Sequence, residues 1–171
     1  MSKDLEYVVR LIADTVFKNE SYFSELDGVV GDGDFGYSIA RGFEKVINEW
    51  DTIDQSTPGN LLKGVSMKIV GAVGGVSGTV WGTAFLRAGI TLGTKTEITR
   101  PDVIAMFRSA IEGIKKRGNA DIGCASAAHN RHDSAFGKCD LEAAFDFFFS
   151  QLLAIEVFHD QFVFALGGGF H

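Results

Sequence analysis

Apolar side chains recur every three or four positions along most of this chain, which is the period of an amphipathic α-helix. Five such segments precede residue 118. No segment alternates apolar and polar residues with the period of two that is typical of a half-buried strand. The pattern therefore predicts an all-α fold, an antiparallel helical barrel or bundle with short loops.

Turn and capping residues set the bounds of these helices. Thr57 followed by Pro58 predicts a helix start, and the helix ends near 74–75. Another helix runs from about 80 to 90, and Thr99 and Gly118 start and end the fifth. The apolar positions of the five helices are Leu5, Val8, Val9, Ile12, Val16 and Phe17; Ile39, Phe43, Val46, Ile47 and Trp50; Leu61, Leu62, Val65, Ile69 and Val70; Trp81, Phe85 and Leu86; and a buried stripe of Val103, Met106, Phe107, Ile111 and Ile114.

A cluster of aspartates and glycines separates the first two predicted helices. Asp27, Asp32 and Asp34 lie within the segment 26–36, which also contains four glycines. Carboxylates this close repel one another unless a hard cation neutralises them, and glycines allow the sharp bends that aim them at one point. A helix N-terminus, which offers free N–H groups to an anion, follows directly. The segment therefore predicts a phosphate ligand held through magnesium.

Other interpretations of this segment compete with a metal site. Asp-Gly pairs also form ordinary turns, and either pair alone would indicate only a turn. An EF-hand starting at Asp32 would need glycine at its sixth position and glutamate at its twelfth, where the chain has Tyr37 and Phe43. The Gly-x-x-x-x-Gly-Lys-Ser/Thr pattern of a P-loop is also absent from the sequence.

A second glycine-rich segment, 74–79, precedes the fourth predicted helix. Its backbone N–H groups and the hydroxyls of Ser77 and Thr79 are suited to cradle a phosphate. Taken alone, it fits a flexible turn between helices better than a phosphate site. Paired with the aspartates, it supplies a phosphate cradle beside the metal.

Composition and charge narrow the range of partners. The 171 residues carry a net charge of −6 and show no basic stripe, which argues against nucleic acid. Polar residues and glycines interrupt the apolar runs and the first residues are charged, so neither a membrane span nor a signal peptide is predicted. Two cysteines do not form a disulfide framework. We expect a cytoplasmic protein.

The composition changes abruptly after Gly123. The last 48 residues hold nine of the fifteen phenylalanines, all four histidines and both cysteines, and a helix is expected around 141–155. The set Cys124, His129, His132 and Cys139 has the residue types of a zinc site but the spacing of no common zinc motif. We divide the chain into a domain of residues 1–123 and a divergent tail of residues 124–171.

Four motifs in order resemble one protein family. They are the aspartate segment 26–36, the run 40–43, the run 74–78 followed by 81–85, and the segment 117–123. Together they resemble the nucleotide-binding L subunit of dihydroxyacetone kinase over about residues 3–123. The resemblance implies a barrel of eight antiparallel helices that binds ADP or ATP through two magnesium ions at one rim.

The resemblance also assigns roles to residues of this chain. It implies that Asp27, Asp32 and Asp34 are the magnesium ligands, with no catalytic residue beyond them. It implies nucleotide contacts at Phe35, Gly36, Tyr37, Ser38, Val76, Ser77, Gly78 and Gly118. Phe35 stands where many relatives carry histidine, and Thr79 where proline is usual. Neither change removes a metal ligand.

The implied reaction is phosphoryl transfer to dihydroxyacetone or a related ketose held on a separate K subunit. Two donors remain open, namely ATP itself and a phosphotransferase-system protein that recharges bound ADP. We also expect homo-oligomers, and neither nucleic acid nor membrane as a partner.

Departures from the family keep rival interpretations open. The later family motifs, Asp-Lys-Thr-Met and Asp-Pro-Gly-Ala, do not occur after Gly123, as after a frameshift, a truncation or true divergence. The rivals are a non-catalytic protein with an incomplete barrel and a degenerate nucleotide pocket, and an inactive fragment that self-associates through its phenylalanine-rich tail.

Overall fold

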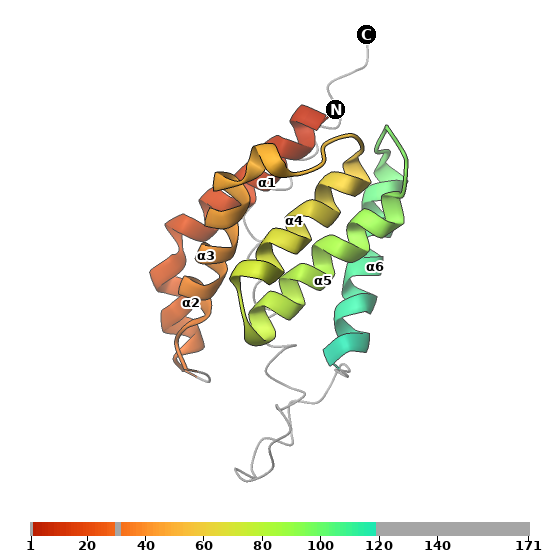
Figure 1. The fold of residues 1–171 in the computed structure, drawn as a ribbon. Coiled ribbons are helices and arrows are strands. Elements are labelled where there is room, and N and C mark those ends of the chain that lie inside the picture. The colour runs from red at the N-terminus through yellow and green to blue at the C-terminus, as the bar shows by residue number, and fades with distance from the viewer. Residues whose placement is uncertain (1, 30–31, 119–171) are drawn as a thin grey trace. The chain divides into compact units, whose positions relative to one another are not determined.

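A computed structural model of the chain describes residues 2–29 and 32–118 (Figure 1). These residues form six α-helices and one 3-10 helix, and the part of the chain that is described contains no strand. The predicted all-α class is confirmed. The elements are α1 (Ser2–Lys18), α2 (Glu20–Asp27), α3 (Phe35–Asn48), η1 (Trp50–Thr52), α4 (Pro58–Ala72), α5 (Gly75–Leu92) and α6 (Arg100–Gly118).

The chain divides into two compact units, Met1–Ile114 and Lys115–His171. Of the second unit, the structure describes only residues 115–118, the last turn of α6. The predicted tail 124–171, its helix and its Cys124–His129–His132–Cys139 set lie outside the described residues, and the domain boundary after Gly123 stays a prediction. None of the described helices combines the length and apolarity needed to cross a bilayer.

Helix α3 is the centre of the first unit, because it contacts α1, α2, α4 and α5. Its face toward the core is apolar, with Ile39, Phe43 and Val46 fully buried. The Phe43 ring meets the rings of Trp81 and Phe85 on α5 edge to face, with centroids 5.7 and 6.0 Å away. This geometry suits the aromatic quadrupoles, and it fixes α3 against α5.

Helices α3 and α4 run antiparallel. Gly42 near the middle of α3 lies against Val73, just after the end of α4. Further along, Glu49 pairs with Lys68, and Ile53 lies against Gly64. The start of α3 and the end of α4 are therefore at the same end of the unit.

Several details differ from the sequence prediction. Helix α2 was not predicted, because Phe23 is its one buried residue and it carries no apolar stripe. Helix α5 begins at Gly75, five residues before the predicted Val80, and Trp50 lies in η1 instead of the preceding helix. In α6, Ile114 is buried but Phe107 is 41% exposed. The contact face of α6 is centred on Ala110 and Gly113, where Gly113 meets Arg87 of α5, and Phe107 lies at its edge.

Candidate metal and phosphate site

The three aspartates of the predicted metal site converge in the structure. Asp27 is the last residue of α2, and Asp34 is the N-cap of α3, with Asp32 in the loop between them. One carboxylate oxygen from each residue lies within 4.8 Å of the other two. Three hard oxygen ligands in one cluster fit a cation such as Mg2+ or Ca2+. The sequence prediction of this grouping therefore agrees with the geometry.

Backbone hydrogen bonds to Asp27 shape the loop. Its Oδ2 accepts from Gly33 N at 2.9 Å and from Phe35 N at 3.3 Å. Gly33 has φ +78°, a left-handed conformation that glycine adopts without strain. The bend turns the chain back so that Asp32 and Asp34 reach the end of α2.

The electrostatics of Asp34 reflect a concentration of negative charge. Burial raises the pKa of Asp34, and the nearby carboxylate of Asp32 raises it further. The Ser38 hydroxyl donates to Asp34 Oδ2 at 3.3 Å and lowers the pKa in part. A divalent cation at this cluster would favour the ionised form and remove the repulsion.

Helix α2 is braced against the first turn of α3. Ser24 Oγ accepts a hydrogen bond from Tyr37 N at 3.3 Å, and the rings of Phe23 and Phe35 lie 6.1 Å apart. Ser24 is a residue of the site that sequence reasoning missed, and nothing in the sequence distinguishes it from the exposed Ser21. The first turn of α3, directly after the aspartates, contains four of the residues predicted to contact nucleotide, namely Phe35, Gly36, Tyr37 and Ser38.

The second glycine-rich segment is mostly the first turn of α5 and not a loop. Gly74 is the N-cap, and Gly75 has φ +64°. The first intrahelical bond is Gly78 N to Gly74 O at 3.4 Å, so the N–H groups of Gly75, Val76 and Ser77 have no acceptor within the helix. The Thr79 hydroxyl, predicted to face a phosphate, instead donates to Gly75 O at 2.9 Å.

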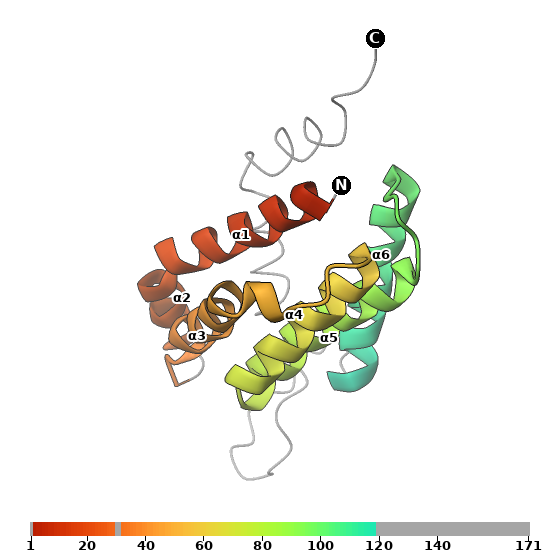
Figure 2. The same cartoon turned by 45° about the horizontal axis from the view of Figure 1, so that its top comes forward.

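Both predicted segments lie at one end of the first unit. Figures 1 and 2 show the turn between α4 and α5 beside the loop between α2 and α3 in both views. The antiparallel register of α3 and α4 brings about this arrangement. Gly118, the remaining residue of the predicted set, is the last residue of α6 and belongs to the second unit.

Comparison with known proteins identifies the family. The model of the DAK2 domain matches residues 29–125, more than half of the chain. The chain belongs to the DAK2 domain family. The match includes Asp32, Asp34 and the start of α5, and it begins two residues after Asp27.

The chain is also similar to curated proteins, among them subunits of dihydroxyacetone kinases. The chain is 36% identical over 109 residues to the PEP-dependent dihydroxyacetone kinase, ADP-binding subunit DhaL, of Escherichia coli (63% of this chain, 52% of the relative). It is 36% identical over 106 residues to the PTS-dependent subunit of Lactococcus lactis (62% and 53%). It is 29% identical over 124 residues to human triokinase/FMN cyclase (71% and 21%). The resemblance seen in the motifs is confirmed, and the chain spans about half the length of the two bacterial relatives.

Proposed function

We propose that this chain binds ADP or ATP together with magnesium and acts as the nucleotide-binding subunit of a dihydroxyacetone-type kinase. The observation that supports this most directly is the convergence of Asp27, Asp32 and Asp34 within 4.8 Å at the start of α3. The names of the bacterial relatives, which are ADP-binding subunits, point in the same direction.

Each part of the site has a role in this proposal. The three aspartates hold magnesium, two ions if the chain follows the family, and the metal neutralises charge on the phosphate oxygens. The N–H groups of Gly75, Val76 and Ser77 donate hydrogen bonds to phosphate oxygens at the positive end of α5. Ser38 and the other residues of the first turn of α3 line the remaining side of the proposed phosphate site. The protein thus contributes positioning and charge neutralisation, which are the main terms in phosphoryl transfer.

The proposal extends to partners that the chain does not contain. Dihydroxyacetone or a related ketose would be held by a separate K subunit, and the phosphoryl donor would be ATP or a phosphotransferase-system protein. The setting is the cytoplasm, and homo-oligomers are part of the proposal. No group beyond the metal ligands is assigned a catalytic role.

Isothermal titration of the full chain with Mg-ADP tests the proposal. We expect a saturable signal for the wild type that disappears when Mg2+ is omitted. Asp32→Asn keeps the side-chain size and removes one ligand charge, so it should weaken Mg-ADP binding by at least about a hundredfold. Glu25→Gln, an exposed acidic position on α2, is the matched control and should bind as the wild type does. Equal affinity of Asp32→Asn and wild type would refute the metal site.

A non-catalytic binding protein is the second candidate, because the later family motifs Asp-Lys-Thr-Met and Asp-Pro-Gly-Ala do not occur after Gly123. In this case the metal cluster persists without a working nucleotide pocket. Thermal unfolding separates the two candidates. A rise in Tm with Mg-ADP beyond the rise with Mg2+ alone supports a competent pocket, whereas equal rises support the degenerate one.

A further inference from the structure

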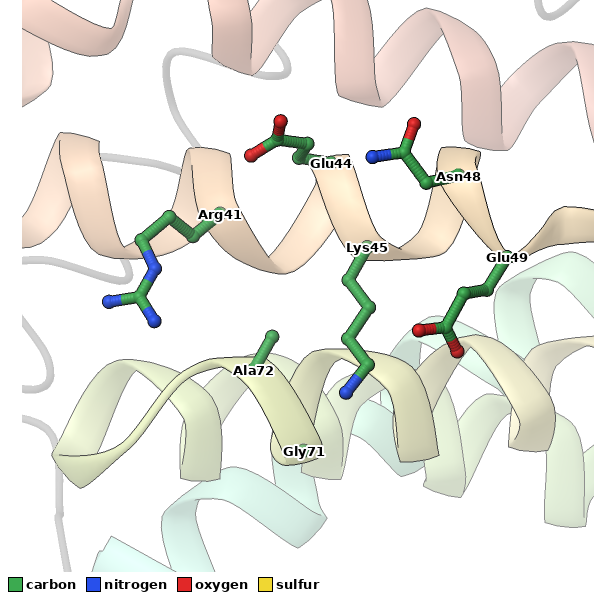
Figure 3. A pocket seen from close by; sticks show the side chains of 7 residues that line it. All are labelled: Arg41, Glu44, Lys45, Asn48, Glu49, Gly71 and Ala72. Carbon is green, nitrogen blue, oxygen red and sulfur yellow. The ribbon is translucent and has the colours of Figure 1, made fainter.

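An open groove of about 350 Å3 lies between α3 and the last turn of α4. Lys45 of α3 reaches across it toward Gly71 of α4, and Arg41 lines its end nearer the start of α3 (Figure 3). The groove begins two helical turns after Asp34, near the end of the unit that carries the aspartates. Neither the sequence motifs nor the proposed metal ligands give this groove a role.

The charges that face the groove are positive once paired groups are set aside. The Glu49 carboxylate forms an ion pair with Lys68. The Glu44 side chain points away from α4 in Figure 3. Among the described residues, neither Arg41 nor Lys45 forms an ion pair. An anion that enters the groove therefore meets Arg41, and beyond it Lys45, which also acts electrostatically on the Glu49 carboxylate.

These two cations differ in where they point. Lys45 Nζ lies 3.5 Å from the position that a β-carbon on Gly71 would take, over the last turn of α4. A cation there is favourable because it faces the negative end of the helix. The Arg41 guanidinium instead turns back along α3, with its central carbon 5.6 Å from the centre of the Tyr37 ring. Figure 3 shows it directed toward the start of α3, beside the turn that leaves α4.

Arg41 lies on the same side of α3 as Asp34, the aspartate of the metal cluster that caps this helix. Asp34, Ser38 and Arg41 are spaced by four and three residues, so they lie on one side of the helix. Seven residues at 1.5 Å each place the α-carbons of Asp34 and Arg41 about 10 Å apart, and the guanidinium turned toward Tyr37 shortens the gap. An arginine fork matches the geometry of a phosphate better than an ammonium does.

We infer that Arg41 binds the distal end of the phosphate chain whose near end is held by magnesium at Asp27, Asp32 and Asp34. This inference rests on the proposed function and adds to it a binding residue that discriminates nucleotides by the length of the phosphate chain. Lys45, which lies over α4, is not part of that contact. The cation–π contact with Tyr37 holds the guanidinium in place.

Titration calorimetry on the full chain tests the inference, with Mg-ATP and Mg-ADP as ligands. Arg41→Gln should weaken Mg-ATP binding by at least about tenfold, as expected for loss of a charge-assisted bidentate contact, and the ratio of ATP to ADP affinity should fall. Arg41→Lys should recover part of the loss, because the charge remains while the fork is gone. Lys45→Gln removes the same charge one turn further away and should change either affinity by less than about threefold. Glu44→Gln controls for charge on the outer side of the helix.

The outcomes separate this inference from the proposed function. If the wild type binds Mg-nucleotide and Arg41→Gln binds both nucleotides with wild-type affinity, the inference is overturned and the proposed function stands. Equal losses of affinity in Arg41→Gln and Lys45→Gln would also overturn it, because they would indicate only a general electrostatic attraction by positive charge. If the wild type binds neither nucleotide, the proposed function fails and takes the inference with it. Circular dichroism should show the same helicity for all variants, since Arg41 and Glu44 are exposed.

Discussion

Gly36 in the first turn of α3 packs directly against the backbone carbonyl of Glu20 at the start of α2. A β-carbon on Gly36 would lie 1.9 Å from Glu20 O and 2.7 Å from Ser24 Oγ. Only a residue without a side chain allows the two helices to approach this closely. The approach places Asp27 at the end of α2 next to the N-terminus of α3, so the metal cluster depends on it.

Substitution of Gly36 by alanine should therefore separate the two helices. We expect a loss of stability of about 1–3 kcal/mol or more, typical of overpacking where backbone cannot move easily, together with weaker Mg2+ binding. Gly71→Ala is the control, because Gly71 is an exposed helical glycine whose β-carbon would meet only Lys45 Nζ at 3.5 Å. It should stabilise by up to about 1 kcal/mol. Urea unfolding measures both, and a stable Gly36→Ala with intact Mg2+ binding would contradict the packing argument.

Helical periodicity predicted five of the six α-helices because each buries a stripe of apolar residues that recurs every three or four positions. Helix α2 escapes that logic, since its place depends on Phe23, on the Ser24 hydroxyl and on a glycine of the next helix. The start of α5 was predicted too late for a related reason. Glycines were interpreted as a loop, although Gly78 allows the first turn to pack against the backbone of Val73.

The metal cluster was accessible from the sequence, because its aspartates and glycines are close in the chain and their chemistry is specific. Arg41 lies in the motif 40–43 but received no role there, since the sequence does not tell a paired surface arginine from one turned toward a site. That distinction depends on the groove that Arg41 lines together with Gly71 and Ala72 of α4, which are distant in the chain. A tertiary arrangement of this kind leaves no periodic signal.

Phe43 should be the most sensitive core position of the first unit. Its side chain is fully buried and touches two aromatic rings of α5. Phe43→Ala should lower the free energy of unfolding by about 3–5 kcal/mol, through lost burial and the cavity that remains. The matched control is Phe17→Ala, because Phe17 on α1 is 39% exposed. This substitution should lower the free energy of unfolding far less than Phe43→Ala does. Denaturant unfolding measures the difference, and similar losses at the two positions would contradict the central place of α3.

The stability of the start of α6 should depend on pH through the carboxylate of Asp102. Its carboxylate accepts hydrogen bonds from Thr99 N at 2.9 Å and from the Thr99 hydroxyl at 2.6 Å, and it pairs with Lys95. The Lys95 ammonium and these bonds hold the pKa of Asp102 well below its usual range. A depressed pKa means that the stabilisation is complete above the unfolded value of about 4 and is lost as pH falls through the lower folded value.

Asp102→Asn should therefore lower Tm at neutral pH, and its difference from wild type should shrink in acid. Thermal unfolding of both proteins between pH 7 and pH 2 measures this difference. Glu97→Gln, in the same loop between α5 and α6, is the control. A difference in Tm that stays constant across this range would indicate a packing effect and not loss of the carboxylate.

Removal of one carboxylate of the metal cluster should raise Tm relative to wild type without metal and lower it relative to wild type with Mg-ADP. In the absence of metal, Asp27, Asp32 and Asp34 crowd three negative charges within 4.8 Å, so Asp34→Asn should raise Tm modestly. With Mg-ADP, the wild type gains stability by mass action, about 2.7 kcal/mol at a hundredfold excess over Kd, and the variant gains little because a ligand is missing. Thermal unfolding with and without Mg-ADP, with Glu25→Gln as the control, measures both arms. A variant that is less stable than wild type without metal would contradict the repulsion, and an undiminished gain with Mg-ADP would contradict the role of Asp34 as a ligand.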